Sequence, residues 1–200
     1  MSADQETVEI YNKYITDYEE LISKEFKDTN LDHFMEMIVS EGKVLDLGCG
    51  TGSASLELLK KGFSIFPVDA SLEMIKVAQS LLKIKARNIS FDDIREHNFY
   101  DAIWANFSLL HITKDQFNVI LKKLFFALKE EGLLFFSLKQ GVGESRDKLG
   151  RFYSYYQKNE VEKYLEKANF QTKKYTKGSS IGLAGNKENW MGFFCEKISL

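Results

Sequence analysis

The stretch Lys43-Val-Leu-Asp-Leu-Gly-Cys-Gly-Thr-Gly52 predicts the fold of this chain. In its first half the apolar residues Val44, Leu45 and Leu47 bracket Asp46, which is typical of a short strand buried on both faces in a parallel sheet. Three glycines follow at alternate positions, and they permit a tight turn and a close approach to a ligand because glycine has no Cβ. We expect Ser53 to cap a helix over 54–61, whose free N–H groups and positive dipole end would face that ligand. A strand, a glycine turn and a helix in this order open a nucleotide-binding βαβ unit.

The glycine spacing indicates which nucleotide the turn would hold. The dinucleotide fingerprint is G-x-G-x-x-G, whereas this chain reads G-x-G-x-G with Asp46 two residues before the first glycine. A carboxylate there would face the pyrophosphate of NAD, which is unfavourable, but it suits a cationic ligand such as the amino-acid end of S-adenosylmethionine. The string Asp-Leu-Gly-Cys-Gly-Thr-Gly therefore resembles the class I S-adenosylmethionine-dependent methyltransferases. A plain glycine-rich turn is the structural alternative.

The resemblance implies S-adenosyl-L-methionine as the cofactor and a set of residues that would bind it. Asp69 follows a second apolar run, over 63–68, and would accept hydrogen bonds from both ribose hydroxyls. Met74 would pack on the adenine, with an ordinary core position as its alternative. Asp93 before Ile94 would hold the adenine amino group, with Asp92 as the competing choice. The cofactor-binding residues predicted in this way are Tyr18, Asp46, Gly48, Cys49, Gly50, Gly52, Asp69, Ala70, Met74, Asp93, Ile94 and Asn106.

Length and composition limit the class of protein. Two hundred residues, 44% of them hydrophobic, fit one compact α/β domain. A net charge of −2 provides no large positive surface, which disfavours a nucleic-acid partner. The longest apolar runs are too short for a membrane span, and the acidic N-terminus lacks a signal-peptide core, so we expect a cytoplasmic protein. The two cysteines, Cys49 and Cys195, have no paired spacing, and neither a metal site nor a disulfide is expected.

The first 42 residues are predicted to form a helical cap over the cofactor site, ahead of a methyltransferase domain over 43–200. Residues 6–25 show helical spacing of apolar side chains, and a second helix is expected over 31–39. The first helix would carry three tyrosines, Tyr11, Tyr14 and Tyr18. By resemblance, Tyr18 and Tyr14 could reach the methionine carboxylate or shield the methyl group. The alternative is an aromatic stripe that packs on the domain.

The middle of the chain carries the first acceptor-side candidates. A helix over 71–83, a strand over 88–94 and a strand over 100–106 are expected. Asn106-Phe107-Ser108-Leu109 lacks the prolines that nucleic-acid amino methyltransferases place after this strand. Leu109-Leu110-His111 instead resembles small-molecule methyltransferases and the tellurite-resistance-like group. His111 could act as a general base, since an imidazole pKa near 6.5 suits neutral pH; alternatively it caps or orients a loop.

The second half predicts the remaining elements and a substrate loop. Thr113 and Gln116 form a capping box before a core-facing helix, and a buried strand is expected over 133–138. The loop 139–156 contains Arg151 and Tyr153, which with His111 are the predicted catalytic residues. Arginine suits carboxylate or phosphate and tyrosine offers a flat face with a hydroxyl. The alternative is a charged surface loop anchored by its aromatic residues. A helix over 158–168 and an antiparallel hairpin with strands over 170–175 and 190–198 complete the chain.

These patterns together predict a Rossmann-like α/β fold: a seven-stranded, mostly parallel sheet with helices on both faces and a C-terminal antiparallel hairpin at its edge. The predicted function is S-adenosylmethionine-dependent methyl transfer to an unidentified, small-molecule acceptor, by a protein that is a monomer or homodimer. A protein or RNA methyltransferase and a non-catalytic cofactor-binding module are the alternatives. A nicotinamide-dependent enzyme is disfavoured by Asp46 and by the glycine spacing.

Overall fold

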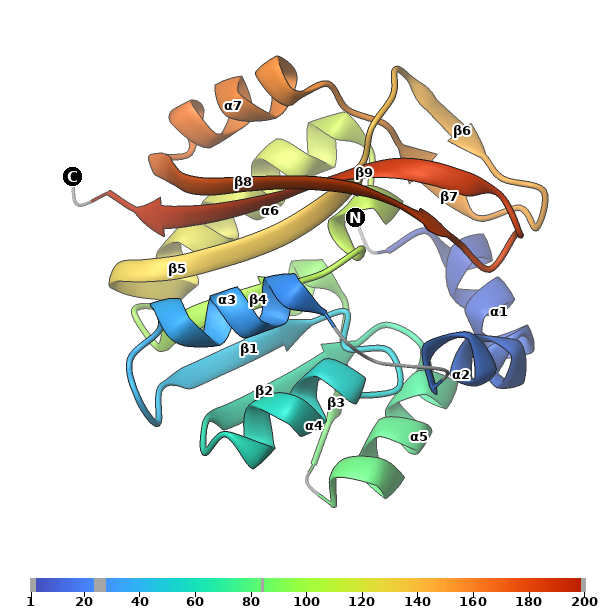
Figure 1. The fold of residues 1–200 in the computed structure, drawn as a ribbon, viewed down its shortest axis with the longest axis horizontal. Helices are drawn as coiled ribbons and strands as arrows, with labels where there is room; N and C mark the ends of the chain where they lie inside the picture. Colours follow the sequence, from blue (N-terminus) through green and yellow to red (C-terminus); the bar gives the residue numbers. More distant parts are fainter. Residues whose placement is uncertain (1–2, 24–27, 84, 199–200) are drawn as a thin grey trace.

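The computed structural model describes residues 3–23, 28–83 and 85–198 and shows a seven-stranded sheet flanked by helices (Figure 1). In spatial order the strands are β3 (Arg87–Asn88), β2 (Ser64–Asp69), β1 (Lys43–Leu47), β4 (Tyr100–Ala105), β5 (Leu128–Lys139), β9 (Lys187–Lys197) and β8 (Phe170–Ile181). β1 to β5 are mutually parallel, and β9 runs antiparallel to both of its neighbours. The predicted fold class is confirmed. The antiparallel strand, however, lies second from the edge, because β8 pairs outside it.

The helices cover both faces of this sheet. They are α1 (Gln5–Lys13), α2 (Ile15–Ser23), α3 (Thr29–Met37), α4 (Ser53–Lys60), α5 (Leu72–Leu82), α6 (Lys114–Ala127) and α7 (Lys158–Lys167), with the 3-10 turns η1 (Phe91–Asp93) and η2 (Leu109–His111). Because successive strand residues point to opposite faces, β4 places Trp104 against Phe34 of α3 and Ile103 among the buried residues of α6. α3 and α4 therefore lie on one face, and α6 and α7 on the other.

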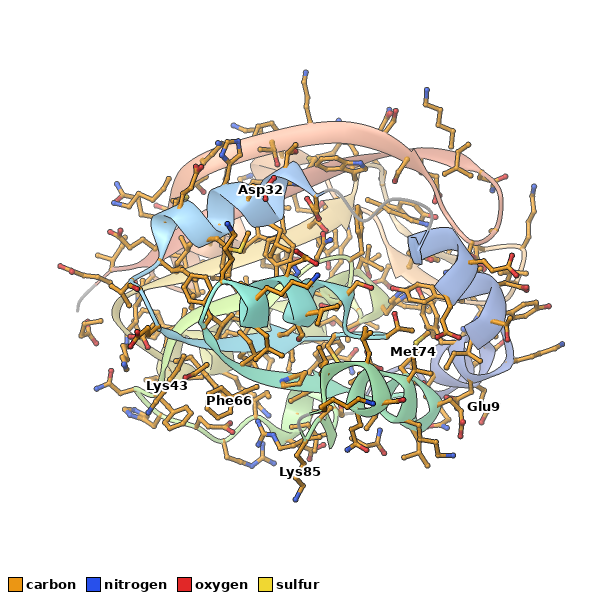
Figure 2. The ribbon with its side chains drawn as sticks, turned by 60° about the horizontal axis from the view of Figure 1, so that its bottom comes forward. Glu9, Asp32, Lys43, Phe66, Met74 and Lys85 are labelled. Atoms are coloured by element: carbon orange, nitrogen blue, oxygen red, sulfur yellow. The ribbon has the colours of Figure 1, made fainter. Side chains whose placement is uncertain are left out.

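The N-terminal region has two structural roles. α1 and α2 replace the single helix predicted over 6–25, because the chain turns at Tyr14 between them; the predicted end of that helix lies outside the described residues. α1 packs against α5, and Met74 of α5 lies on the side that faces the N-terminal helices (Figure 2). α3 begins after Asp28, whose carboxylate caps it, and its Leu31 and Phe34 belong to the sheet core.

Several predicted boundaries differ from the structure for local reasons. The strand predicted over 88–94 is only two residues long, because Ser90 and Asp93 close a capping box that bends the chain into η1. Ser53 is the first residue of α4 rather than its cap, since Gly52 occupies the cap position with a φ of 90°. The loop 139–156 contains a hairpin of β6 (Glu144–Arg146) and β7 (Phe152–Ser154). The capping box at Thr113 is confirmed.

Pro67 lies in the middle of β2, where a residue without an N–H is unusual. Val68 accepts hydrogen bonds from the turn after β1, whereas Asp69 accepts one from Ile89 on the β3 side. Since successive residues face alternate neighbours, Pro67 faces the β3 side. β3 pairs with β2 only at Val68 and Asp69, so Pro67 precedes that pairing and leaves no ladder bond unmade. Because β3 does not reach Pro67, this part of β2 lies at an open edge of the sheet, and the proline removes a hydrogen-bond donor from that edge. Lys85, just before β3, is exposed and points into solvent (Figure 2).

Candidate active site

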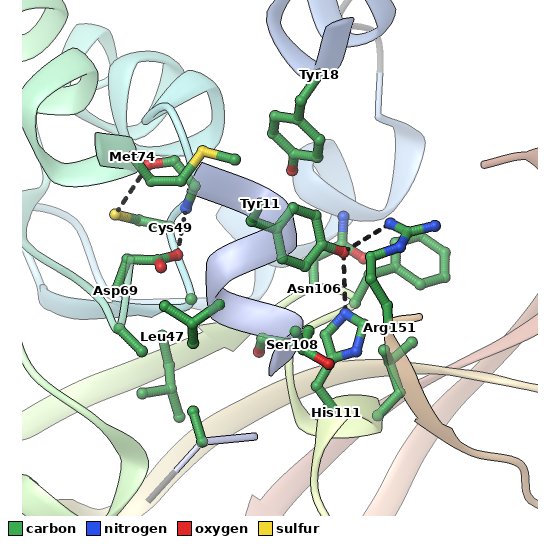
Figure 3. A pocket seen from close by; sticks show the side chains of 18 of the residues that line it. Tyr11, Tyr18, Leu47, Cys49, Asp69, Met74, Asn106, Ser108, His111 and Arg151 are labelled. Carbon is green, nitrogen blue, oxygen red and sulfur yellow. Dashed lines mark hydrogen bonds between the residues drawn. The ribbon is translucent and has the colours of Figure 1, made fainter. Parts of the chain in front are cut away.

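A pocket of about 360 Å³ opens at the carboxyl ends of β1, β2 and β4 (Figure 3). Open α/β sheets bind ligands at this edge, where the strand order reverses, and the volume lies within the range of about 300–1,000 Å³ found for ligand sites. One half of its wall comes from the glycine turn and the end of β2. The other half comes from η2, the β6–β7 hairpin and β9, and α1 contributes Tyr11.

The glycine turn needs glycine at two positions that line the pocket. Gly48 has a φ of 78°, and a Cβ there would lie 2.4 Å from the Cβ of Ser108. Gly50 has a φ of 53°, and its Cβ would lie 3.2 Å from the hydroxyl oxygen of Tyr18. The turn is fixed to β2 because the N–H groups of Gly48 and Cys49 both donate to the carbonyl of Val68. Its backbone is therefore held open toward the pocket.

Asp46 is a buried carboxylate beneath this turn. One of its oxygens accepts a hydrogen bond of 2.6 Å from the hydroxyl of Ser55 on α4. Burial raises the pKa of Asp46 from 3.8 to about 7, because the charged form loses its hydration. A cationic group in the pocket would restore the favourable environment of the ionised form, so the site suits a ligand with an ammonium group.

Asp69 lies at the end of β2 and orders the turn around it. Its two oxygens accept from the N–H groups of Gly50 and Ser71, at 2.9 and 2.8 Å. Burial raises the pKa of Asp69, and the two backbone hydrogen bonds act against that rise. Each carboxylate oxygen can accept a further hydrogen bond, so Asp69 can still bind hydroxyl groups of a ligand.

A hydrogen-bonded network lines the opposite half of the pocket. Arg151, which is buried, donates from Nε and Nη2 to one oxygen of Asp147, at 3.0 and 2.7 Å. Its Nη1 donates to the hydroxyl oxygen of Tyr11 at 3.0 Å. That hydroxyl lies 3.0 Å from Nε2 of His111, and Nδ1 of His111 lies 2.7 Å from the carbonyl oxygen of Phe152. Figure 3 shows Tyr11 between Arg151 and His111.

The partners of His111 fix its tautomer. A carbonyl oxygen only accepts, so Nδ1 carries the hydrogen and donates it to Phe152, and Nε2 of the neutral ring accepts from Tyr11. Burial, with the nearby cations of Arg151 and Lys139, lowers the pKa of His111 from 6.5 to about 3. The imidazole is therefore neutral at pH 7 with both nitrogens hydrogen-bonded. General-base action by His111 stays a prediction, and it would first require release of Tyr11.

A second ion pair borders the same half. Lys139, at the end of β5, pairs with Glu188 of β9 and lies 3.4 Å from the ring centroid of Tyr153. Burial lowers the pKa of Lys139, while Glu188 acts in the opposite direction. The rings of Phe107 and Trp190 meet edge to face at 6.1 Å on this side of the pocket. This half thus combines flat aromatic walls with charges that are already paired.

A family model described as "Methyltransferase domain" matches residues 17–174. The chain belongs to this family. The family match confirms the predicted methyltransferase class.

Relatives and solved structures agree with this membership. The chain is 33% identical over 137 residues to a putative methyltransferase, YqeM, of Bacillus subtilis, covering 64% of this chain and 55% of that protein. It is 26% identical over 179 residues to an uncharacterised methyltransferase of Staphylococcus carnosus, covering 86% and 84%. The fold matches a 1,6-didemethyltoxoflavin-N1-methyltransferase of Burkholderia thailandensis, solved with S-adenosylhomocysteine, with a TM-score of 0.73, 17% identity and coverage of 100% and 92%.

The residues of the pocket fit the predicted cofactor. The pocket offers a buried carboxylate for an ammonium group at Asp46 and a second carboxylate for hydroxyls at Asp69. Ser108 adds a buried hydroxyl oxygen beside Gly48 with no hydrogen-bond partner among the described residues, which a polar ligand group could satisfy. The family's cofactor carries an ammonium group, ribose hydroxyls and a polar carboxylate, and the site has a group suited to each of the first two.

Most of the predicted site residues meet in the pocket. Those that line it are Tyr18, Asp46, Gly48, Cys49, Gly50, Asp69, Ala70, Met74 and Asn106 from the cofactor set, and His111, Arg151 and Tyr153 from the catalytic set. Gly52, Asp93 and Ile94 lie outside it. Gly52 packs toward Leu82 of α5. The Asp93 carboxylate accepts from the N–H of Ser90, and Ile94 is buried in the core, so η1 presents Ser90 and Phe91 to the pocket instead.

The predicted set omits residues that the fold brings to the pocket. Tyr11 is the principal one, and its position seven residues before Tyr18 on a helical pattern was the available signal. Lys139 and Glu188 come from the ends of β5 and β9. Only the pairing of those two strands places them together, and no local motif marks them. Among the described residues there is no group of three or more potential metal ligands and no helix long and apolar enough to cross a membrane.

Proposed function

We propose that this protein is an S-adenosylmethionine-dependent methyltransferase that acts on a small-molecule acceptor. The observation that carries the proposal is the pairing of Asp46 and Asp69 on either side of a glycine turn, at the switch point of the sheet. One carboxylate suits the ammonium of the methionine end and the other suits the ribose hydroxyls. Met74, which is buried and lines the same half, offers an apolar contact for the adenine.

The chain's own residues position the reactants. When bound, the cofactor supplies a methyl group on a sulfonium, which is already a good leaving group. The glycine turn and the two carboxylates would orient it, and Tyr18 would close the turn from above, since its hydroxyl lies against Gly50. Correct orientation can supply about 7–11 kcal/mol of barrier lowering in favourable cases. Positioning residues should therefore matter more than any single acid or base.

We call the half of the pocket opposite the glycine turn, lined by Tyr11, His111 and Arg151, the acceptor half. The acceptor is proposed to be small because two segments of the chain narrow this half. Tyr11 of α1 and Arg151 beside the β6–β7 hairpin are bonded to each other over the pocket, and Thr7 accepts from the N–H of Phe152 across the same junction at 2.8 Å. The resemblance of Leu109-Leu110-His111 to small-molecule and tellurite-resistance-like methyltransferases supports the same acceptor class. The net charge of −2 gives no general attraction for nucleic acid.

Calorimetric titration tests the cofactor. We expect micromolar binding of S-adenosylmethionine and S-adenosylhomocysteine to the wild-type protein, no binding of NADH, and a large loss of affinity in Asp69→Ala. Glu73→Ala is the matched control, because Glu73 lies four residues further on and forms an exposed pair with Lys76. Absence of cofactor binding to the wild type would overturn the proposal.

Labelling tests the acceptor class. A lysate incubated with the protein and methyl-labelled cofactor should transfer label to compounds of low molecular mass. Label in protein or RNA would contradict the proposed acceptor class.

We also propose that the protein is cytoplasmic, since Cys49 and Cys195 are buried and free, which suits a reducing compartment. We propose in addition that it is a monomer or a homodimer, and light scattering would measure its mass in solution.

A further inference from the structure

We propose that the rings of Phe107 and Trp190 form a binding surface for a planar, uncharged aromatic group of the methyl acceptor. The inference rests on the proposed methyltransferase function and narrows its substrate class from small molecules in general to those with a flat ring system. Phe107 follows β4, and Trp190 pairs with Lys139 at the carboxyl end of β5. Both rings therefore lie at the edge of the sheet where the pocket opens, and both line it.

Phe107 is presented to the pocket by an unfavourable backbone conformation. Its φ of 51° lies in the left-handed region, which a bulky residue rarely adopts. The N–H of Phe107 donates to the buried hydroxyl of Ser137 at 2.8 Å, and that hydroxyl donates to Asn106 at 2.6 Å, so the turn is held in place. The ring nevertheless stays 37% exposed. A strained backbone that leaves an aromatic ring uncovered is typical of a ligand contact rather than of core packing.

Trp190 is held in place by the strand beside it. It pairs with Gly178 in the β8–β9 ladder, and a Cβ on Gly178 would lie 2.5 Å from Cζ2 of the indole. The indole therefore lies directly against the glycine, where any larger side chain would displace it. Trp190 is only partly buried. The sheet thus fixes the position of the indole and leaves part of its surface available to a ligand in the pocket.

The two rings form a corner that suits a planar group. Their planes are inclined at 89° to each other, with the centroids 6.1 Å apart. A flat ring that enters the corner can stack on one of them and meet the edge of the other, and both geometries are favourable for aromatic pairs. Ile181, which is 61% exposed, and Leu183 continue this wall at the tip of the β8–β9 hairpin. An exposed apolar patch inside a pocket is typical of a ligand-binding surface.

The polar groups of the acceptor half are already engaged. Lys139 pairs with Glu188, and Arg151 pairs with Asp147, whose side chain is 7% exposed. The neutral imidazole of His111 has both nitrogens hydrogen-bonded. A charged acceptor would have to compete with these interactions, whereas an uncharged ring on Phe107 and Trp190 leaves all of them intact. The surroundings therefore favour an aromatic acceptor over an ionic one.

Matched neutral probes test the inference without a known acceptor. Naphthol is planar and aromatic, and decahydronaphthol is its saturated counterpart with the same carbon skeleton and hydroxyl group. The saturated compound has the larger apolar surface, so apolar burial alone would favour it, whereas stacking favours naphthol. In NMR titrations of the wild-type protein saturated with S-adenosylhomocysteine, we expect naphthol to bind about fivefold more tightly than decahydronaphthol.

Two variants locate the effect. Trp190→Leu and Phe107→Gly should each abolish the preference for naphthol and change the affinity for S-adenosylhomocysteine less than twofold. Glycine is the replacement at 107 because it adopts a positive φ without strain, so the turn should keep its shape. Phe126→Leu is the matched control, since the Phe126 ring is 52% exposed, stacks on His97 and is not among the residues that line the pocket.

The outcomes separate the two proposals. If S-adenosylhomocysteine fails to bind the wild type, the proposed function falls and this inference with it. If it binds but decahydronaphthol binds as tightly as naphthol, or neither probe binds, the inference alone is overturned. A preference for naphthol that survives in both variants would overturn it as well. An equal loss of affinity for naphthol and for S-adenosylhomocysteine would also contradict it, because the rings would then serve the cofactor.

Discussion

Replacing Asp46 by asparagine should stabilise the ligand-free protein at neutral and alkaline pH. In the folded protein burial raises the pKa of Asp46 to about 7, against an ordinary value of 3.8. Above pH 7 the unfolded chain gains the full benefit of an ionised, hydrated carboxylate, and the folded chain does not. The difference of 3.2 between the two pKa values corresponds to about 4 kcal/mol of unfolding free energy. Asparagine removes this penalty and can still accept the hydrogen bond from Ser55.

The sign and the pH range follow from the raised pKa. Below about pH 3, both states of the wild type hold the proton and the penalty vanishes. It grows as the pH rises from 3.8 to 7, reaching about 1.6 kcal/mol at pH 5 and the full value of about 4 kcal/mol at pH 8. The stability gain of Asp46→Asn over the wild type should therefore increase by roughly 2–3 kcal/mol between pH 5 and pH 8.

Urea unfolding of both proteins at pH 5, 6, 7 and 8 measures this difference. Asp101→Asn is a control of opposite sign on the neighbouring strand. Hydrogen bonds from Lys129 and from the N–H of Lys43 lower the pKa of Asp101 despite its partial burial, so this variant should be less stable than the wild type at pH 8 and approach it in acid. A gap between Asp46→Asn and the wild type that does not change with pH would refute the reasoning, because Asp46 would then titrate as it does in the unfolded chain.

The pH dependence of ligand binding tests the raised pKa of Asp46 independently. If only the ionised form accepts the ammonium of S-adenosylhomocysteine, the competent fraction falls from about one half at pH 7 to about one tenth at pH 6, and the affinity should fall about fivefold. Asp46→Asn should bind weakly and lose this pH dependence. A variant that is more stable yet binds the ligand more weakly would show that the buried acid serves binding at the expense of stability.

Three further predictions concern the turn and the acceptor half. Gly50→Ala should weaken S-adenosylhomocysteine binding at least tenfold, whereas Gly143→Ala, also at positive φ but with open space around it, should cost about 1 kcal/mol of stability and leave binding unchanged. Asp147→Asn should lower the unfolding free energy by about 3–5 kcal/mol because it leaves the buried Arg151 without a charged partner. Glu57→Gln, in an exposed ion pair with Lys60, should lower the unfolding free energy by at most about 0.5 kcal/mol. The pKa of His111 is lowered to about 3, so the unfolded histidine takes up a proton between pH 7 and pH 5 that the folded one does not, and over that range the wild type should lose about 2 kcal/mol relative to His111→Gln in urea titrations.

The cofactor half was predictable from the sequence because its signals are local. Asp46 and the glycines lie within seven residues, and the conformation that they require follows from the absence of a Cβ. Asp69 could be placed because an apolar run ends there, and parallel strands bring their carboxyl ends to one edge. The position of Asp93 could not be predicted in this way. The residues around it do not reveal that Ser90 and Asp93 form a capping box, which ends the strand early.

The acceptor half depends on contacts between distant parts of the chain. Tyr11 and Arg151 are 140 residues apart and meet only because α1 packs beside the β6–β7 hairpin. The sequence indicated arginine and tyrosine in the loop 139–156, but it gave no sign that Asp147 would pair with Arg151 inside the protein. The same limit applies to Lys139 and Glu188, which β5 and β9 bring together.

Stability does not account for the polar groups that surround the acceptor half. A buried ion pair contributes about as much as well-packed apolar residues of similar size, or less, and a histidine held neutral by burial makes the fold more sensitive to acid. Three elements nevertheless direct these groups at one hydroxyl: α1 supplies Tyr11, the hairpin region supplies Arg151, and η2 supplies His111. Since α1 has only Thr7 fully buried, its packing contributes little on its own, and its polar contacts with the hairpin make up much of its attachment. This half of the pocket is therefore complete only when α1 lies in place, because Tyr11 is the group that joins Arg151 to His111.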